Sequence, residues 1–245
     1  MAKAENTNKR NSMVGVINKK GYLSFLKKVL DHFIMNIENI EVIKNDFLLY
    51  IDNDLEKFSE FKEKLPIIKD SLSKDLDFFM LSDPAIDNRD EVIFCYPGFK
   101  AIAYYRIAHE LRNLGFLLVS RMITEEAHSL TGIDIHPGAK IEVPLFIDHG
   151  TGTVIGETAE IGSHVKLYQG VTLGAISLSN CSSVKGVKRH PTIGNYVTIY
   201  SCASILGNVK IGDNTTIGAN VFLTEDVPSG VKVTIGKPEL IIKEK

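Results

Sequence analysis

The 245-residue sequence has few cysteines and no marked excess of either charge. Its three cysteines are an odd number without a CxxC pair, which fits reduced thiols better than a disulfide framework or a zinc knuckle. Since 28 Lys and Arg stand against 30 Asp and Glu, nothing indicates nucleic-acid binding. No stretch reaches membrane-spanning length, and the polar N-terminus lacks the apolar block of a secretory signal. These absences predict a soluble, cytoplasmic protein.

What the sequence does contain is a branched apolar residue at every sixth position. The thirteen positions form three runs: Ile135, Ile141 and Ile147; Ile155, Ile161, Leu167 and Leu173; Ile193, Ile199, Ile205, Ile211, Ile217 and Leu223. A period of six fits neither the 3.6 residues of a helical turn nor the simple alternation of a sheet, so the chain folds back on itself in short, equal sides. The pattern predicts a parallel β-helix with this Ile/Leu column pointing inward.

The period slips twice, and each slip lies beside a histidine. Ile147 and Ile155 are eight residues apart, across Asp-His-Gly-Thr-Gly. Leu173 and Ile193 are twenty apart, so fourteen extra residues leave the coil as a loop that ends in Lys-Arg-His-Pro. A repeat that breaks its rule accommodates either a harmless insertion or a site. We therefore expect the chemistry at these two slips.

The part of the chain before the repeats has helical patterns. Apolar spacing predicts helices over 22–37 and 47–58, another after an interruption at Pro66, and two more over 98–113 and 116–130. We expect a disordered segment over 1–20, a helical domain over 21–132, a β-helix over 133–236 with a loop at 175–190, and a tail over 237–245. The helical domain could serve assembly or cap the open end of the coil.

Several motifs occur together in a fixed order. They are Asp-Ile-His-Pro-Gly-Ala (134–139), Ile-Asp-His-Gly-Thr-Gly (147–152), Ile-Gly-Glu-Thr (155–158), Gln-Gly-Val-Thr-Leu-Gly (169–174) and Arg-His-Pro (189–191). With Asp-Pro-Ala (83–85) and Tyr-Tyr-Arg-Ile-Ala-His (104–109), they resemble the serine O-acetyltransferase family of hexapeptide-repeat acyltransferases. The resemblance implies an α-helical N-terminal domain followed by a left-handed parallel β-helix, assembled as a homotrimer or a dimer of trimers. It also implies acetyl transfer from acetyl-CoA to the hydroxyl of L-serine, a step of cysteine biosynthesis.

This reaction needs a base, because an aliphatic hydroxyl is a poor nucleophile at neutral pH. Histidine has a pKa suited to that task. His149, which lies among small residues on the slipped coil, is the predicted general base. The resemblance makes Asp134 the carboxylate that orients its imidazole. The alternative interpretation of His149 is a turn histidine without a catalytic role.

Four further residues are predicted to bind the acceptor. The resemblance places Arg189 and His190 at the serine site, where the guanidinium fork suits a carboxylate. It places Asp83 and Asp148 beside the ammonium group of serine. The alternatives are a solvated charge for Arg189 and a turn cap for Asp83. L-Cysteine, which is isosteric with serine, is the expected feedback inhibitor.

For acetyl-CoA, the resemblance implies a groove along the coils between two subunits. The matching positions are Gly174, Ala175, Ser201 and Ala219. Where relatives often have Ile-Gly-Ala-Gly-Ala, this chain has Ile-Tyr-Ser-Cys-Ala at 199–203, and a usual basic residue is Thr216. Both departures concern the nucleotide end of the groove, where Lys237 or alternatively Lys232 is expected to supply the missing basic residue.

Metal and partner predictions follow from what the motifs omit. The histidines are not spaced as in the zinc site of γ-class carbonic anhydrases, so no metal is expected, and Cys181 has no assigned base that would make it an acyl carrier. The sequence ends in Lys-Glu-Lys without the isoleucine that many relatives insert into cysteine synthase, so we expect a weak complex or none. Two alternatives stay open: acetylation of another hydroxyl, such as that of a sugar or homoserine, and a non-catalytic scaffold.

Overall fold

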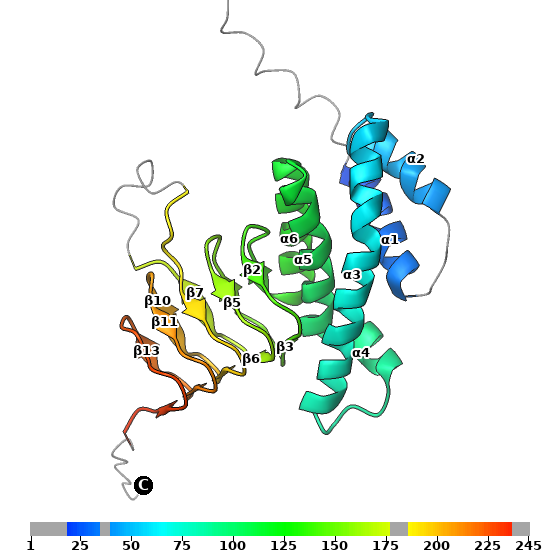
Figure 1. Cartoon of the computed structure of the whole chain (residues 1–245). Helices are drawn as coiled ribbons and strands as arrows, with labels where there is room; N and C mark the ends of the chain where they lie inside the picture. The colour runs from blue at the N-terminus through cyan, green and yellow to red at the C-terminus, as the bar shows by residue number, and fades with distance from the viewer. Residues whose placement is uncertain (1–18, 35–39, 177–185, 237–245) are drawn as a thin grey trace, which may run out of the picture.

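The computed structural model describes residues 19–34, 40–176 and 186–236. In these ranges a set of helices is followed by short parallel strands (Figure 1). The helices are α1 (Lys19–Ile34), α2 (Ile40–Tyr50), α3 (Leu55–Ser82), α4 (Arg89–Cys95), α5 (Pro97–Asn113) and α6 (Leu117–Thr131). Three predicted features lie outside the described residues: most of the segment expected to be disordered, the tail with Lys237, and the middle of the loop, with Cys181.

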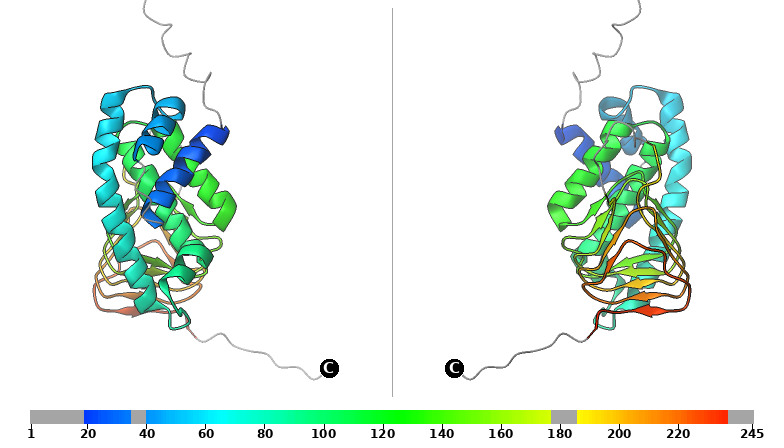
Figure 2. Two further views of the ribbon diagram at one scale, coloured as in Figure 1. Left: turned by 90° about the vertical axis from the view of Figure 1, so that its right-hand side faces the viewer. Right: turned by 90° about the vertical axis from the view of Figure 1, so that its left-hand side faces the viewer.

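The strands form three parallel sheets, and each sheet is one side of the coil (Figure 2). The sheet orders are β1-β4-β7-β10-β13, β2-β5-β8-β11 and β3-β6-β9-β12-β14. The strands are β1 (Asp134–Ile135), β2 (Lys140–Ile141), β3 (Leu145–Ile147), β4 (Val154–Ile155), β5 (Glu160–Ile161), β6 (Val165–Leu167), β7 (Thr172–Gly174), β8 (Thr192–Ile193), β9 (Thr198–Ile199), β10 (Ser204–Leu206), β11 (Lys210–Ile211), β12 (Thr216–Ile217), β13 (Phe222–Leu223) and β14 (Lys232–Val233). The predicted parallel β-helix is confirmed.

The Ile/Leu column forms the core of this coil. Its members from Ile135 to Ile217 are all buried, and Leu223 on the last coil is half-buried. Removing an Ile or Leu side chain from water contributes about 1.5–3 kcal/mol, so the repeated column supplies much of the driving force for coiling.

Both slips leave the strand register intact. Asp134 pairs with Val154, twenty residues later, whereas Val154 pairs with Thr172, eighteen residues later. Thr172 in turn pairs with Ser204, thirty-two residues later. The two extra residues and the fourteen extra residues are therefore taken up at corners, outside the stack of strands.

Two of the predicted helices are wrong in their limits. The pattern over 47–58 is broken, because Asp54 accepts hydrogen bonds from the backbone N–H groups of Glu56 (2.8 Å) and Lys57 (3.4 Å) and starts a new helix. Helix α3 also continues through Pro66, which lies on its exposed side. The interior proline costs about 3 kcal/mol. We attribute the continuity to the buried face of α3, where side chains on both sides of the proline pack into the core.

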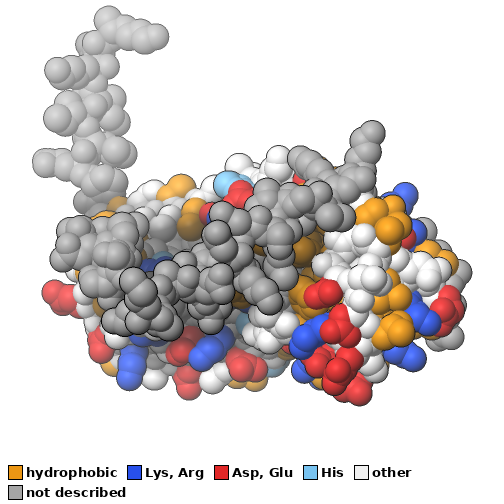
Figure 3. Space-filling model, turned by 90° about the horizontal axis from the view of Figure 1, so that it is seen from above, with side chains coloured by type: hydrophobic (Ala, Val, Ile, Leu, Met, Phe, Trp, Pro, Cys, Tyr) orange, Lys and Arg blue, Asp and Glu red, His pale blue; other side chains and the backbone are white. Residues whose placement is uncertain are grey.

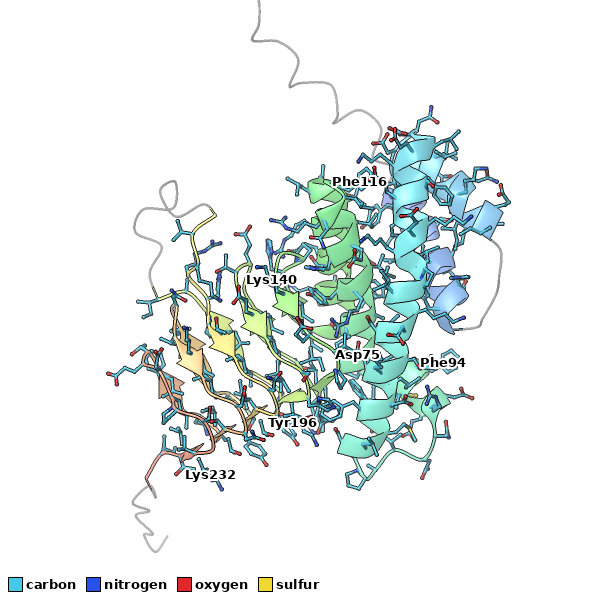
Figure 4. The ribbon with its side chains drawn as sticks, viewed as in Figure 1. Asp75, Phe94, Phe116, Lys140, Tyr196 and Lys232 are labelled. Carbon is cyan, nitrogen blue, oxygen red and sulfur yellow. The ribbon has the colours of Figure 1, made fainter. Side chains whose placement is uncertain are left out.

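Helices α3 and α5 close the first coil with a buried ion pair. Arg106 Nε and Nη2 lie 3.1 Å from the two carboxylate oxygens of Asp75, which is labelled in Figure 4. Arg106 Nη1 also donates to the carbonyl oxygen of Ile141 (2.6 Å), and Asp75 accepts from the backbone N–H of Leu145 (2.9 Å). An open coil end would leave such backbone groups unpaired. The helical domain therefore caps the β-helix.

The surface carries both signs of charge. Figure 3 shows acidic and basic side chains intermixed over the helical end of the molecule, in keeping with a net charge of −2. No single sign of charge dominates the visible part of that face.

Candidate active site

His149 lies at the corner between β3 and β4, where the first slip is accommodated. Its backbone is left-handed (φ 55°), as are those of Gly150 (φ 76°) and Gly152 (φ 78°). A Cβ on Gly150 would lie 2.4 Å from the Ile133 side chain, so glycine is required there. The His149 side chain is 69% exposed, and its Nδ1 lies 3.6 Å from a carboxylate oxygen of Asp148. The imidazole is thus open to solvent and supported by a neighbouring carboxylate.

Asp134, the predicted orienting carboxylate, has a different partner. It lies on β1, and one of its oxygens is 3.5 Å from Arg121 Nη1. Within the described residues no hydrogen bond or ion pair joins Asp134 to His149. The structure therefore brings Asp148, rather than Asp134, into contact with the predicted base.

Asp83 lies at the end of α3 and is held by two donors. The backbone N–H of Ala85 donates to one carboxylate oxygen (2.8 Å), and the Tyr96 hydroxyl donates to the other (2.7 Å). Burial, this hydrogen bond and the charges of Asp83 and Asp148 raise the pKa of Tyr96 above its usual value. Burial, Tyr200 and the same two charges raise the pKa of Tyr168. Asp83 is thus a turn cap. Its charge and that of Asp148 also act on the same two tyrosines.

The first of two groups of candidates can now be defined. We call the turns 148–153, 168–171, 200–203 and 218–221 the His149 corner, because they stack on one edge of the coil. Ser201 and Ala219, predicted to contact the cofactor, lie on this corner below His149. The backbone carbonyl of Ser201 accepts from the N–H of Asn220 (2.9 Å), and Ala219 is exposed.

Arg189 and His190 lie on a different edge, which we call the His190 corner. It comprises the turns 136–139 and 156–159 with residues 174–176 and 186–191. Arg189 Nη2 donates to Glu157 (2.6 Å), and Arg112 Nη2 donates to the other oxygen of that carboxylate (3.0 Å). The guanidinium is therefore partly engaged already, and it is not a freely solvated charge.

His190 is buried on the same corner and is neutral at pH 7. Burial, and then the Arg189 charge, lower the pKa of its imidazole to about 4. Its Nδ1 accepts the backbone N–H of Thr158 (3.1 Å), so its Nε2 carries the proton. A Cβ on Gly156 would lie 2.0 Å from the ring, which explains the glycine at that position. His190 is thus a fixed N–H donor.

The His190 corner also holds an open cavity of about 310 Å³. It is lined by Arg112, Gly138, Lys140, Glu157, Thr158, Ala159, Glu160, Gly186 and Lys188, and Lys140 is labelled in Figure 4. The predicted cofactor residue Gly174 ends β7 on this corner, and Ala175 follows it. The candidate residues therefore divide between two edges of one chain, separated by one side of the coil.

Other kinds of site were sought in the described part of the chain. Within it, no group of three or more His, Cys, Asp or Glu side chains could hold a metal ion. Of the helices described there, none is long and apolar enough to cross a membrane. Cys95 and Cys202 are exposed free thiols.

Comparison with known proteins decides the family. A family model described as bacterial transferase hexapeptide (six repeats) matches residues 190–225. The serine acetyltransferase of Helicobacter pylori strain 26695 is 45% identical over 174 residues, which cover 71% of this chain and 98% of that protein. The chain belongs to the serine acetyltransferase family. Its members are acyltransferases.

Other serine acetyltransferases extend this result. A plasmid-encoded one from Synechococcus elongatus is 50% identical over 173 residues, 69% of this chain, although the match spans only 54% of the relative's length. The structure of Entamoeba histolytica serine acetyltransferase 1 in complex with L-cysteine has a TM-score of 0.76 at 41% identity, covering 88% of this chain and 86% of that one. The Neisseria gonorrhoeae enzyme in complex with serine has a TM-score of 0.69 at 27% identity, covering 92% and 98%. The predicted fold, helices followed by a left-handed parallel β-helix, is confirmed.

Sequence reasoning missed the residues that hold the candidate serine acetyltransferase site in place. Glu157 fixes Arg189, and Thr158 fixes His190. Their signal was present, because both belong to the Ile-Gly-Glu-Thr motif. Tyr96, which donates to Asp83, belongs to no motif, and only the fold brings it there.

Proposed function

We propose that this chain transfers the acetyl group of acetyl-CoA to the hydroxyl of L-serine, giving O-acetyl-L-serine and CoA. One observation carries the choice of acceptor. Asp83 and Asp148 have no Lys or Arg partner among the described contacts; Asp148 adjoins the exposed His149, and the charges of both carboxylates act on the same two phenols, Tyr96 and Tyr168. Such a pair suits an acceptor with an ammonium group. Family membership, and the solved relative in complex with serine, support the same acceptor.

In the proposed mechanism His149 is the general base. Its imidazole accepts the serine hydroxyl proton as the oxygen forms a bond to the thioester carbonyl carbon. When the carbon–sulfur bond breaks, the imidazolium returns that proton to the departing thiolate, so charge and atoms balance. Asp134 keeps its predicted role of orienting the imidazole and stabilising its cation, which requires its carboxylate to turn from Arg121 toward His149 when substrate binds. Asp148 adjoins the same imidazole and is proposed to face the substrate's ammonium group.

The His190 corner is proposed to hold the serine carboxylate. Arg189 supplies a guanidinium fork that Glu157 keeps in place. His190 supplies a neutral N–H donor. Acetyl-CoA is proposed to lie along Gly174, Ala175, Ser201 and Ala219, where small side chains leave the backbone accessible, and Lys237, outside the described residues, is proposed to meet its nucleotide end. The relative solved with L-cysteine supports that amino acid as an inhibitor at the serine site.

We also propose that the site is completed by a second subunit. His149 and the turn that holds His190 lie at opposite ends of one side of the coil, which consists of β4 and its flanking turn residues and spans at most roughly 20 Å for six residues at 3.3 Å each. One serine molecule is too small to contact both corners of a single chain. A homotrimer around an axis parallel to the coil would place the His149 corner of one subunit against the His190 corner of the next.

A subunit-mixing experiment tests this assembly. We expect the His149→Ala and Arg189→Ala variants to be almost inactive separately, and to recover about one quarter of wild-type activity when co-expressed in equal amounts. The quarter arises because random mixing pairs an intact His149 with an intact Arg189 at one interface in four. The measurement is CoA release by purified mixed oligomers, with each variant co-expressed with itself as the control. A site contained within one chain would give no recovery.

The reaction itself is tested with a panel of acceptors. We expect acetyl-CoA to release CoA thiol with L-serine but not with homoserine or a simple sugar, because homoserine carries its hydroxyl one methylene farther from the ammonium and carboxylate, and a sugar has neither charged group. Release with another acceptor alone would replace serine in the proposal. If no acceptor works and acetyl-CoA leaves the melting temperature unchanged, the chain is a scaffold rather than an enzyme.

A further inference from the structure

Tyr96 has a rigid position between two helices beside the acceptor site. It ends α4, where its backbone N–H donates to Val92 (3.2 Å), and it precedes α5, where its carbonyl accepts from Lys100 (3.2 Å). Its ring meets that of Phe79 edge to face, with centroids 6.0 Å apart. With both backbone groups bonded and the ring packed, the hydroxyl has little freedom to move.

That hydroxyl donates to Asp83 at 2.7 Å. The second carboxylate oxygen of Asp83 accepts from the N–H of Ala85 at 2.8 Å. Each oxygen is therefore fixed by one neutral donor, and each keeps lone-pair capacity for a further partner. A neutral donor fixes the orientation of a carboxylate without cancelling its charge, which leaves the charge available to an ammonium group.

Aromatic contacts connect this pair to the His149 corner. Phe79 contacts Phe146 with centroids 4.7 Å apart, and Phe146 contacts Tyr168 at 6.5 Å. Tyr168 begins the turn of the second coil on the His149 corner, and it stacks on Tyr200 with centroids 5.1 Å apart. Packed rings therefore connect Tyr96 to Tyr168, and the charges of Asp83 and Asp148 act on both phenols. Because the pKa values of Tyr96 and Tyr168 are both raised, the phenols stay protonated at neutral pH.

We propose that Tyr96 is a positioning residue that acts through Asp83: its hydroxyl holds this carboxylate in the orientation that receives the acceptor's ammonium group. The inference rests on the proposed function and adds a residue that no motif indicates. In this proposal Asp83 and Asp148 provide the negative charge that attracts the ammonium group. Tyr96 fixes the orientation of the Asp83 carboxylate.

The Tyr96→Phe variant tests the proposal, because it removes the hydroxyl and keeps the packed ring. We expect the KM for L-serine and the calorimetric Kd of L-serine to rise about tenfold, which is the size of one hydrogen bond to a charged group. The KM for acetyl-CoA and the melting temperature should remain close to the wild-type values. The matched control is Tyr104→Phe, which removes a half-buried phenol from α5 without touching Asp83.

A double-mutant cycle shows whether Tyr96 acts through Asp83. In the Asp83→Asn background, Tyr96→Phe should add less than a twofold change in kcat/KM for serine. Fully additive effects, a parallel rise in the KM for acetyl-CoA, or a Tyr96→Phe variant indistinguishable from Tyr104→Phe would each overturn the inference. If the wild type shows no serine-dependent release, the proposed function itself fails, and this inference fails with it.

Discussion

Replacing His149 with alanine is expected to lower serine-dependent CoA release at least 100-fold. General-base catalysis contributes about 10²–10⁴-fold, and the described residues offer no other histidine at the His149 corner to take over the proton. The side chain is 69% exposed and its packing contribution is small, so the variant should fold normally. The measurement is kcat/KM for L-serine at saturating acetyl-CoA, together with the melting temperature.

The control for this experiment is His164→Ala. His164 also lies in a left-handed turn (φ 58°), but it stacks on Tyr196 at another corner of the coil (centroids 4.6 Å apart). Its replacement should leave kcat unchanged. An equal loss in both variants would indicate damage to the coil, and full activity of His149→Ala would refute the general-base assignment.

Replacing Arg106 with methionine is expected to lower the free energy of unfolding by about 3–5 kcal/mol. The substitution leaves the Asp75 carboxylate, which is 0% exposed, without its charged partner. It also removes donors from the carbonyl oxygens of Ile141 (2.6 Å) and Glu142 (3.2 Å) at the end of the first coil. Urea unfolding followed by circular dichroism measures the effect.

A neighbouring ion pair provides the comparison. Lys74 and Asp70 lie on the same helix with a separation of 2.6 Å, but both side chains are more than half exposed (59% and 63%). Lys74→Met should change the free energy of unfolding by no more than about 0.5 kcal/mol. If Arg106→Met proves equally mild, burial does not determine the strength of this pair, and the cap is held by apolar packing instead.

The sequence predicted features that depend on short-range repetition. The Ile/Leu column follows from a local rule repeated thirteen times, so its inward orientation needed no knowledge of distant contacts. The helix start after Asp54 was missed, because a side-chain cap outweighs local helix propensity. The continuity of α3 through Pro66 was missed, because its packed face outweighs the helix-breaking tendency of proline. Contacts such as Arg106 with Asp75, thirty-one residues apart, arise only from the packing of α5 on α3.

The sequence predicted individual residues of the candidate site but not their arrangement in space. Motif order identified His149 and His190 but carried no information on which edge of the coil each occupies. The strand pairing shows which edge each histidine occupies, because β4 separates the turn that contains His149 from the turn that packs against His190. The partners of Asp134 and Asp83 were likewise unpredictable, since Arg121 reaches Asp134 across a helix–coil contact and Tyr96 reaches Asp83 through the packing of α3 against α4 and α5.

The register across the long loop bears on how such enzymes can diversify. Thr172 and Ser204 pair in line although thirty-two residues separate them, so the coil is indifferent to what is inserted at this corner. The entropy of closing a loop rises by only about 0.6 kcal/mol for each doubling of its length. Insertions next to Arg189 and His190 are therefore cheap in stability. Evolution, or a protein engineer, can therefore change the segment that borders the proposed serine site. The stacked coils proposed to bind acetyl-CoA stay the same.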